Sequence, residues 1–197
     1  STLIKILTGV HPPDTGEVIY QGVPTQFKSP MDARRNGIET VYQDYSLVNL
    51  MSIARNFFLG NELTKSIGPL HFLDHKKMNE ESMRVISEIG VSVRGAHEFV
   101  SYLSGGERQS ISIGRAMYFG AKLLVLDEPF AALGIRETVQ AMENIRKANE
   151  AGASIIVITH NVHHVYPLSH RFALLDHGQK TAEMVKADLS LEELTEI

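Results

Sequence analysis

The sequence predicts an α/β fold with a mainly parallel sheet, an antiparallel β portion and an inserted helical subdomain. Two continuous apolar runs, Leu123–Leu126 and Ser154–Ile158, are separated by a long charged segment with helical character. Such runs, joined by helices, are typical of parallel strands that are buried on both faces. The alternating segment Glu17–Gln21, and two later strands about a turn at Asp176–Gly178, predict the antiparallel portion.

In the first half of the chain, short strands alternate with helices, and a mainly helical stretch follows. We expect a helix on the apolar residues Leu3, Ile6 and Leu7, and a helix at 74–89 that Asp74 caps. The apolar face of the second helix consists of Met78, Val85, Ile86 and Ile89. The other elements predicted here are strands at 17–21 and 38–42, helices at 31–36 and 51–59, and a loop at 60–73.

In the second half, helices and strands follow one another with the rhythm of an α/β core. The predicted helices and strands are a helix at 105–118, a strand at 123–126, a helix at 136–150, a strand at 154–158, a hairpin from strands at 172–175 and 181–185, and a helical tail at 189–197.

Composition and charge restrict the class of protein. The chain has 197 residues, 43% hydrophobic and 21% charged, which is the balance of a soluble globular domain with one good-sized core. No run approaches the roughly 18 consecutive apolar residues of a membrane-spanning helix. Cysteine is absent, which excludes disulfides and fits a reducing cytosol. The net charge of −4 argues against nucleic-acid binding through a basic face.

Two adjacent carboxylates, Asp127 and Glu128, follow the apolar run at Leu123–Leu126. Open α/β sheets bind ligands at the carboxyl ends of their strands, so both side chains fall where a ligand is expected. One carboxylate can hold a magnesium shell while its neighbour orients or deprotonates water, which is what phosphate hydrolysis requires. Taken alone, the pair is equally compatible with an acidic turn at the end of a strand.

A second candidate site is Ser104-Gly105-Gly106, which opens the helix predicted at 105–118. A serine hydroxyl and two glycines leave the N–H groups of a helix N-terminus open to an anion, and the helix dipole favours negative charge there. The same triplet also suits a plain loop with a helix cap. Its spacing to the following apolar strand, with Gly114-Arg115-Ala116 between, argues against coincidence.

Polar residues also follow two other predicted strands: Gln43 comes after one and His160 after the other. Both therefore project toward the sheet edge that carries Glu128. A glutamine can reach a metal or a water, and a histidine can donate to charge that develops on a phosphate. Taken singly, each residue also suits a surface or capping role.

Taken in order, these motifs resemble those of the ATP-binding subunits of ABC transporters, which are P-loop NTPases, over essentially the whole chain. The most specific segment is Leu103–Gln109, which resembles the family's signature. The other matching segments are Gln43 (Q-loop), Leu123–Pro129 (Walker B), Ala132–Gly134 (D-loop) and Thr159-His160 (H-loop). The resemblance divides the chain into an N-terminal part of the ATPase core at 1–46, a helical subdomain at 47–103 and the remainder of the core at 104–197.

The resemblance implies that the cofactors are ATP and Mg²⁺, and that ATP lies between two such domains arranged head to tail. It makes Glu128 the residue that polarises the attacking water and His160 the residue that stabilises transferred charge, with Gln43 as the third catalytic residue. The implied magnesium ligands are Ser1, Gln43 and Asp127. The implied nucleotide-binding residues are Ser1, Thr2 and Asp127 of one domain and Ser104, Gly105 and Gly106 of its partner.

The start of the sequence, Ser1-Thr2-Leu3, resembles the residues that follow the Gly-Lys pair of a Walker A loop. The glycines and the lysine that precede this serine in the family are not in the sequence. If the molecule begins at Ser1, we expect weak or no nucleotide binding, and a non-catalytic interaction module becomes the alternative function. Gly134 stands where many members carry aspartate, as is familiar in the sugar-importer branch.

The segments around the Q-loop and the H-loop resemble bacterial monosaccharide importers of the ribose, xylose and fructose type. The resemblance implies sugar import driven by ATP hydrolysis, on the cytoplasmic face of the inner membrane. The implied partners are permease subunits, a second ATPase domain and, indirectly, a periplasmic sugar-binding protein, with no nucleic acid. The permease would dock on the subdomain at 47–103. Apolar residues that either line that groove or pack in the helical core are Leu50, Met51, Phe57 and Phe58.

Two other interpretations have less support in the sequence. An ABC-type ATPase of DNA repair or chromosome structure usually carries a coiled-coil or zinc insertion between the Q-loop and the signature, and the sequence between Gln43 and Leu103 has neither heptads nor cysteine. His160, His163 and His164 have the helical spacing of metal ligands. Because no carboxylate pattern accompanies them, a zinc site is not expected.

Overall fold

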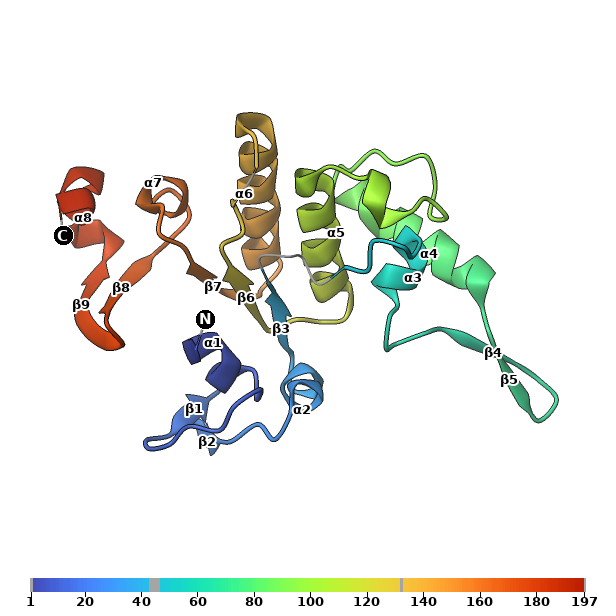
Figure 1. The fold of residues 1–197 in the computed structure, drawn as a ribbon, viewed down its shortest axis with the longest axis horizontal. Coiled ribbons are helices and arrows are strands. Elements are labelled where there is room, and N and C mark those ends of the chain that lie inside the picture. Colours follow the sequence, from blue (N-terminus) through green and yellow to red (C-terminus); the bar gives the residue numbers. More distant parts are fainter. Residues whose placement is uncertain (1, 43–46, 132, 197) are drawn as a thin grey trace.

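The computed structural model describes residues 2–42, 47–131 and 133–196 (Figure 1). Its centre is a sheet of three parallel strands in the order β3 (Ile38–Val41), β6 (Leu123–Asp127) and β7 (Ser154–Ile158). The apolar runs that predicted β6 and β7 therefore pair as neighbours, and the predicted α/β class with a parallel sheet is confirmed.

The middle strand β6 is buried because both faces of the sheet are covered by helices. Leu124 and Leu126 pack against the helices on one face, while Val125 points to the other face and packs with Ile4. This alternation follows from the two-residue period of a strand. The helices concerned are α5 (Gly105–Tyr118) and α6 (Ile135–Glu150) on the first face, and α1 (Thr2–Leu7) and α2 (Pro30–Arg35) on the second.

Three antiparallel hairpins surround this centre: β1 (Val18–Tyr20) with β2 (Val23–Thr25), β4 (Thr64–Ile67) with β5 (Leu70–Leu73), and β8 (Arg171–Asp176) with β9 (Gln179–Val185). The first contains the predicted strand at 17–21, although its partner β2 was not predicted. The third is the predicted late hairpin, with both strands slightly longer than expected. The antiparallel portion of the fold is thus confirmed.

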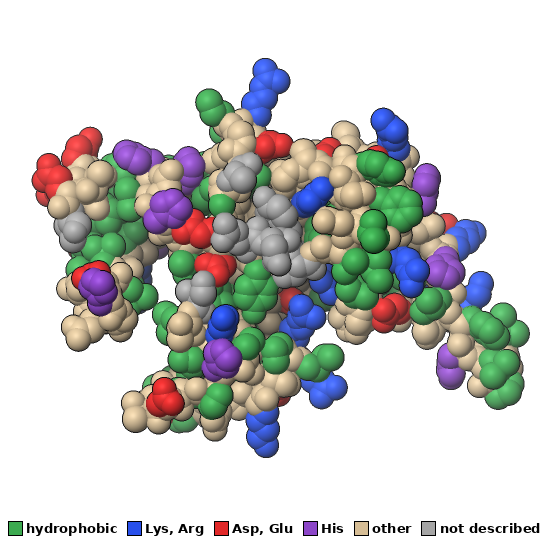
Figure 2. All heavy atoms as spheres, in the orientation of Figure 1, with side chains coloured by type: hydrophobic (Ala, Val, Ile, Leu, Met, Phe, Trp, Pro, Cys, Tyr) green, Lys and Arg blue, Asp and Glu red, His purple; other side chains and the backbone are tan. Residues whose placement is uncertain are grey.

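The prediction of a loop at 60–73 is wrong, because this segment forms the β4–β5 hairpin. Gly68, at a φ of 61°, and Pro69 make its two-residue turn. The hairpin extends away from the helices, with hydrophobic side chains at its end (Figures 1 and 2). All eight strand residues are exposed. Because neither strand packs on a core, the sequence lacks the regular alternation of apolar and polar residues by which half-buried strands are predicted.

The region at 47–103 is mainly helical, with α3 (Ile53–Phe57), α4 (His75–Glu88) and a 3₁₀ turn at Val100–Tyr102. Asp74 caps α4 as predicted, because its Oδ1 accepts from the Lys77 amide at 3.1 Å. Phe57 and Phe58 are fully buried in the helical core, Met51 is half-buried, and Leu50 is 84% exposed. The division of the chain at residues 46 and 103 stays a prediction.

Small differences from the predicted elements occur near both ends. Helix α1 buries Ile4 rather than Leu3, which is 51% exposed. The helical tail is shorter than predicted, with a 3₁₀ turn at Lys186–Asp188 before α8 (Leu191–Glu196), and the short α7 (Val162–Val165) was not predicted. Among the described residues, none of the helices has the length and apolar character to cross a membrane.

Candidate functional site

Four polar residues gather where β6 and β7 end, and we call Asp127, Glu128, Thr159 and His160 the strand-end cluster. The two strands lie side by side and end at the same edge, because Asp127 pairs with Ile158 in the parallel register. The Glu128 amide donates to the Ile158 carbonyl at 2.8 Å, which fixes the residue after β6 to the end of β7. Glu128 has a φ of 50°, a left-handed conformation that non-glycine residues adopt mainly where function or packing requires it.

The Glu128 carboxylate is held through both oxygens by donors from the segment after β7. Its Oε2 accepts from the Thr159 hydroxyl at 3.0 Å. Its Oε1 accepts from the His160 backbone N–H at 3.1 Å and lies 2.8 Å from His160 Nδ1. Because a carboxylate only accepts, Nδ1 carries the proton of this contact and Nε2 is left for a second partner. The prediction that Glu128 and His160 share one sheet edge is therefore met in the geometry.

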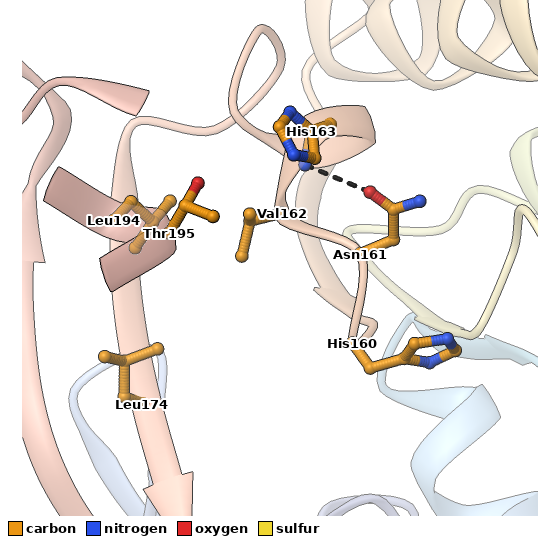
Figure 3. Close-up of a pocket in the computed structure, with 7 residues that line it drawn as sticks. All are labelled: His160, Asn161, Val162, His163, Leu174, Leu194 and Thr195. Carbon is orange, nitrogen blue, oxygen red and sulfur yellow. Dashed lines mark hydrogen bonds between the residues drawn. The ribbon is translucent and has the colours of Figure 1, made fainter. Parts of the chain in front are cut away.

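The His160 ring is turned toward Glu128 and away from a neighbouring cavity (Figure 3). The ring is 86% exposed, whereas the Glu128 side chain is only 23% exposed. The cavity, about 490 Å³ in volume, lies between α7, β8 and α8. Its lining residues are His160, Asn161, Val162, His163, Leu174, Leu194 and Thr195.

Asp127 ends β6 with a half-buried side chain, and it is the only predicted magnesium ligand within the described residues. The other two, Ser1 and Gln43, lie outside them. Carboxylate oxygens are the donors that Mg²⁺ prefers, so the chemistry of Asp127 fits the ion. Thr2, the remaining predicted nucleotide-binding residue of this half, is exposed at the first position of α1. No described group of three or more acidic or histidine side chains could hold a metal, so the structure gives no support to zinc ligation by His160, His163 and His164.

Ser104, Gly105 and Gly106 form the first turn of α5, and we call them the signature turn. Ser104 Oγ accepts from the Glu107 amide at 3.3 Å, while Glu107 Oε2 accepts from the Ser104 amide at 2.8 Å. This capping box satisfies two of the donors at the start of the helix. The amides of Gly105 and Gly106 are the other first-turn donors, which have no carbonyl partner within a helix. They are therefore suited to bind an oxyanion.

Gly106 lies directly against the start of α6. A Cβ placed on Gly106 would lie 2.9 Å from both Cβ and Cγ of Glu137, so a side chain at this position has no room. Glu137 is held there because its Oε2 accepts from the Gly134 amide at 2.9 Å. The start of α6, which directly follows the D-loop segment at 132–134, therefore packs on the signature turn.

A buried series of hydrogen bonds between side chains of α5 and α6 also holds the signature turn in place. Ser110 Oγ donates to the Gly106 carbonyl at 2.9 Å and accepts from Asn144 Nδ2 at 2.8 Å. Asn144 is 2% exposed and Ser110 is 1% exposed, so water does not compete for these bonds. Helix α6 thus holds the turn through a side chain as well as through apolar packing.

Arg115, near the end of α5, joins that helix to the helical region. Its Nε and one terminal nitrogen donate to the Phe57 and Leu59 carbonyls at 2.9 and 2.8 Å, at the end of α3. Burial is the main cause that lowers the pKa of Arg115, and burial likewise raises the pKa of Glu39 on β3. Glu39 also forms an ion pair with Arg34 at 3.4 Å. Arg115 therefore links α5 with the end of α3, and the Glu39–Arg34 pair links β3 with α2.

The structure groups the predicted residues into two separate sets. Glu128 and His160 contact one another, and Ser104 to Gly106 share one helix start. Within residues 2–42, 47–131 and 133–196, no hydrogen bond or ion pair joins Glu128 or His160 to the signature turn.

Sequence reasoning placed Thr159 in the H-loop segment but gave it no contact, and it did not single out Glu137 or Asn144, although each contacts a predicted site residue or its helix. Thr159 could have been found from its place between a strand and His160. The contacts of Glu137 and Asn144 depend on how α5 and α6 pack, and no local sequence pattern predicts them.

The sequence profile of the ABC transporter family matches residues 1–131. The match covers more than half of the chain, and the chain belongs to the ABC transporter family.

Similar proteins include several import ATP-binding proteins. The chain is 40% identical over 197 residues to a xylose/arabinose import ATP-binding protein of Sulfolobus acidocaldarius, covering 100% of the chain and 77% of the relative. It is 37% identical over 197 residues to a fructose import ATP-binding protein of Rhizobium meliloti, covering 98% and 76%. A ribose import ATP-binding protein of Yersinia pestis is 36% identical over 194 residues, which are 98% of the chain but only 37% of that relative.

Solved structures share the fold at low sequence identity. A nucleotide-free ATP-binding cassette from an ABC transporter matches with a TM-score of 0.80 and 20% identity, over 100% of the chain and 78% of that structure. A dimeric cassette in a post-hydrolysis state with ADP and Pi matches with a TM-score of 0.75 and 21% identity, over 94% and 79%. These likenesses establish the fold of the chain as that of an ATP-binding cassette.

Proposed function

We propose that this chain is the ATP-hydrolysing part of a monosaccharide importer, acting at the cytoplasmic face of the membrane. The observation that carries the proposal is the Glu128 carboxylate, held at the end of β6 by Thr159 and His160. The names of the relatives support the direction of transport and the class of cargo, since they are import proteins for xylose/arabinose, fructose and ribose.

In this proposal, the strand-end cluster supplies the groups that act on the attacking water. Glu128 accepts a proton from that water or orients it, and His160 donates from Nε2 to charge that develops on the transferred phosphate. Asp127 holds the shell of Mg²⁺, together with Ser1 and Gln43, which lie outside the described residues. Bound ATP and Mg²⁺ supply the phosphoryl group and the neutralising charge for this reaction.

The signature turn supplies the second half of the site, and it acts on the nucleotide of a partner domain. The amides of Gly105 and Gly106, together with the Ser104 hydroxyl, would bind the phosphate oxygens from the opposite side. Support comes from the separation of the two sets of residues within one chain, and from the dimeric state of a solved cassette with the same fold. Closure of the dimer would then be passed to permease subunits through the helical region at 47–103.

The test is the rate of ATP hydrolysis by the native polypeptide, with any sequence that precedes Ser1 retained. Glu128→Gln keeps the size of the side chain but removes its ability to take a proton. We expect this change to lower kcat at least about 100-fold while Mg·ATP binding stays within about twofold. The matched control is Glu17→Gln, which removes an exposed carboxylate just before β1 and should leave both quantities unchanged.

Two results would contradict the proposal. The first is a purified, folded protein that binds no Mg·ATP in a calorimetric titration, which would leave a non-catalytic interaction module. The second is a Glu128→Gln variant with the wild-type rate. The cargo is tested separately, by uptake of labelled xylose, fructose and ribose into cells with and without the protein.

A further inference from the structure

Thr159 lies between β7 and His160, and its hydroxyl makes two contacts with opposite roles. It donates to Oε2 of Glu128 at 3.0 Å and accepts from the Asn161 backbone N–H at 3.1 Å. The direction of the hydroxyl proton is therefore fixed, because the Asn161 amide can only donate and the carboxylate can only accept.

The turn that follows holds the Asn161 amide in place. Asn161 is the N-cap of α7, and its Oδ1 accepts from the His163 amide at 3.1 Å (Figure 3). The short helix thus fixes Asn161, the Asn161 amide orients the Thr159 hydroxyl, and that hydroxyl holds Glu128. Thr159 is half-buried, so bulk water competes only partly for these bonds.

The two oxygens of the Glu128 carboxylate are not equivalent. Oε1 receives both donors of His160, the backbone N–H and Nδ1, which use its two lone-pair positions. Oε2 receives only the Thr159 hydroxyl from the described residues, so one acceptor position remains on it. The oxygen with capacity for a further donor, such as the proton of a water molecule, is the one that Thr159 holds.

We propose that Thr159 is a positioning residue, which aims Oε2 of Glu128 at the attacking water. The proposal rests on the proposed ATPase function. Without the hydroxyl, the carboxylate is tied only through Oε1 to His160, whose ring is exposed, and rotation of the carboxylate is no longer restrained on the other side. Misplacement of a catalytic group by about 1 Å reduces the rate of the chemical step more than it reduces substrate binding.

The test compares three substitutions by steady-state hydrolysis of Mg·ATP in the native polypeptide. Thr159→Val keeps the shape of the side chain and removes the hydroxyl, Thr159→Ala removes it without branching, and Thr159→Ser keeps it. We expect kcat to fall at least about tenfold in the first two variants, with KM within about twofold of wild type. Thr159→Ser should retain kcat within about twofold. The matched control is Thr181→Val on β9, an exposed threonine whose loss should change neither constant.

The outcomes separate this inference from the proposed function. If Glu128→Gln abolishes hydrolysis but either folded hydroxyl-free variant keeps kcat within about twofold, Thr159 has no positioning role. A Thr159→Ser variant that folds but is as slow as Thr159→Val also overturns the inference, because it shows that the methyl group rather than the hydroxyl matters. If the wild-type protein does not hydrolyse ATP, both proposals fail together. Thermal unfolding of each variant identifies those that fail to fold. If Thr159→Val is one of them, Thr159→Ala alone serves as the hydroxyl-free variant.

Discussion

The strand-end cluster and the signature turn both consist of polar groups at the end of a regular element, but they use those groups differently. In the strand-end cluster, both oxygens of Glu128 have partners within the chain. In the signature turn, the capping box satisfies Ser104 and Glu107, whereas the amides of Gly105 and Gly106 have no partner in their helix. In the first region, partners within the chain orient the carboxylate, whereas in the second the two glycine amides are left without a partner in their own helix.

The two regions are held in place by different parts of the fold. The strand-end cluster depends on one strand pair and the turn after β7, because the donors to the Glu128 side chain within the described residues are Thr159 and His160. The signature turn depends on α6, which contacts it through Glu137 and Asn144. Substitutions should therefore separate the orientation of the Glu128 carboxylate from the rigidity of the signature turn.

The largest expected effect tests whether the two regions serve the same site from different chains. Ser104→Asp retains the helix cap, since aspartate caps as well as serine, but it places negative charge where a phosphate would bind. We expect Ser104→Asp and Glu128→Gln each to be nearly inactive alone. Mixed one to one, with subunit exchange and independent sites, they should recover roughly a quarter of the wild-type rate, because each mixed dimer contains one site free of both changes.

The measurement is the ATPase rate as a function of the mixing ratio. Each variant mixed with buffer gives the baseline, and energy transfer between two separately dye-labelled batches of the wild-type protein shows whether subunits exchange. If exchange occurs and the two variants still recover no activity, the two regions belong to one site in the same chain, and the comparison is wrong.

The next effect concerns the packing of the signature turn on α6. Gly106→Ala should reduce the free energy of unfolding by about 2 kcal/mol, because the new Cβ would meet the fixed Cβ of Glu137. Gly114→Ala, in the same helix, is the matched control. Its Cβ meets the movable end of Ile89 at 2.9 Å, and alanine favours the helix, so we expect a change of less than about 1 kcal/mol. Urea denaturation measures both, and equal losses would remove the special role of the Gly106 contact.

A last pair of substitutions tests the buried hydrogen bonds beneath the turn, where we expect losses no larger than that of Gly106→Ala. Asn144→Leu should cost about 1 kcal/mol, because Ser110 keeps its acceptor at the Gly106 carbonyl. Ser110→Ala should cost about 2 kcal/mol, since it leaves Asn144 Nδ2 buried without that partner. In the double variant, the loss should be smaller than the sum of the single losses, because both changes remove the same bond. Strict additivity in urea denaturation would mean that the bond contributes nothing.

The sequence predicted the sheet and its principal helices because their residues are periodic and apolar. Leu123 to Leu126 and Ser154 to Ile158 could be identified as buried strands, and α5 has the predicted bounds. The β4–β5 hairpin escaped prediction because neither strand packs on a core. Helix α7 has four residues, too few to show a helical period, so its existence depends on the cap at Asn161 and on the surrounding fold.

The candidate site could be predicted as a set of residues but not as a set of contacts. The positions of Glu128 and His160 at neighbouring strand ends follow from the order of the strands. The Thr159 hydroxyl bond to Oε2 depends on the left-handed φ of Glu128 and on the direction of the Asn161 amide, and neither quantity is encoded in a short pattern. The contact of Gly106 with Glu137 likewise requires the packing of two helices.

That contact also has a consequence for how the sequence can vary over generations. Gly106 lies in the signature and Glu137 lies in the first turn of α6, yet a side chain at 106 would need the space that Glu137 fills. A larger residue at 106 is tolerated only after the chain at 137 has withdrawn, and Glu137 cannot withdraw without releasing the Gly134 amide that it caps. The residue at 137 therefore limits which residues position 106 can carry, although the two positions are far apart in the sequence.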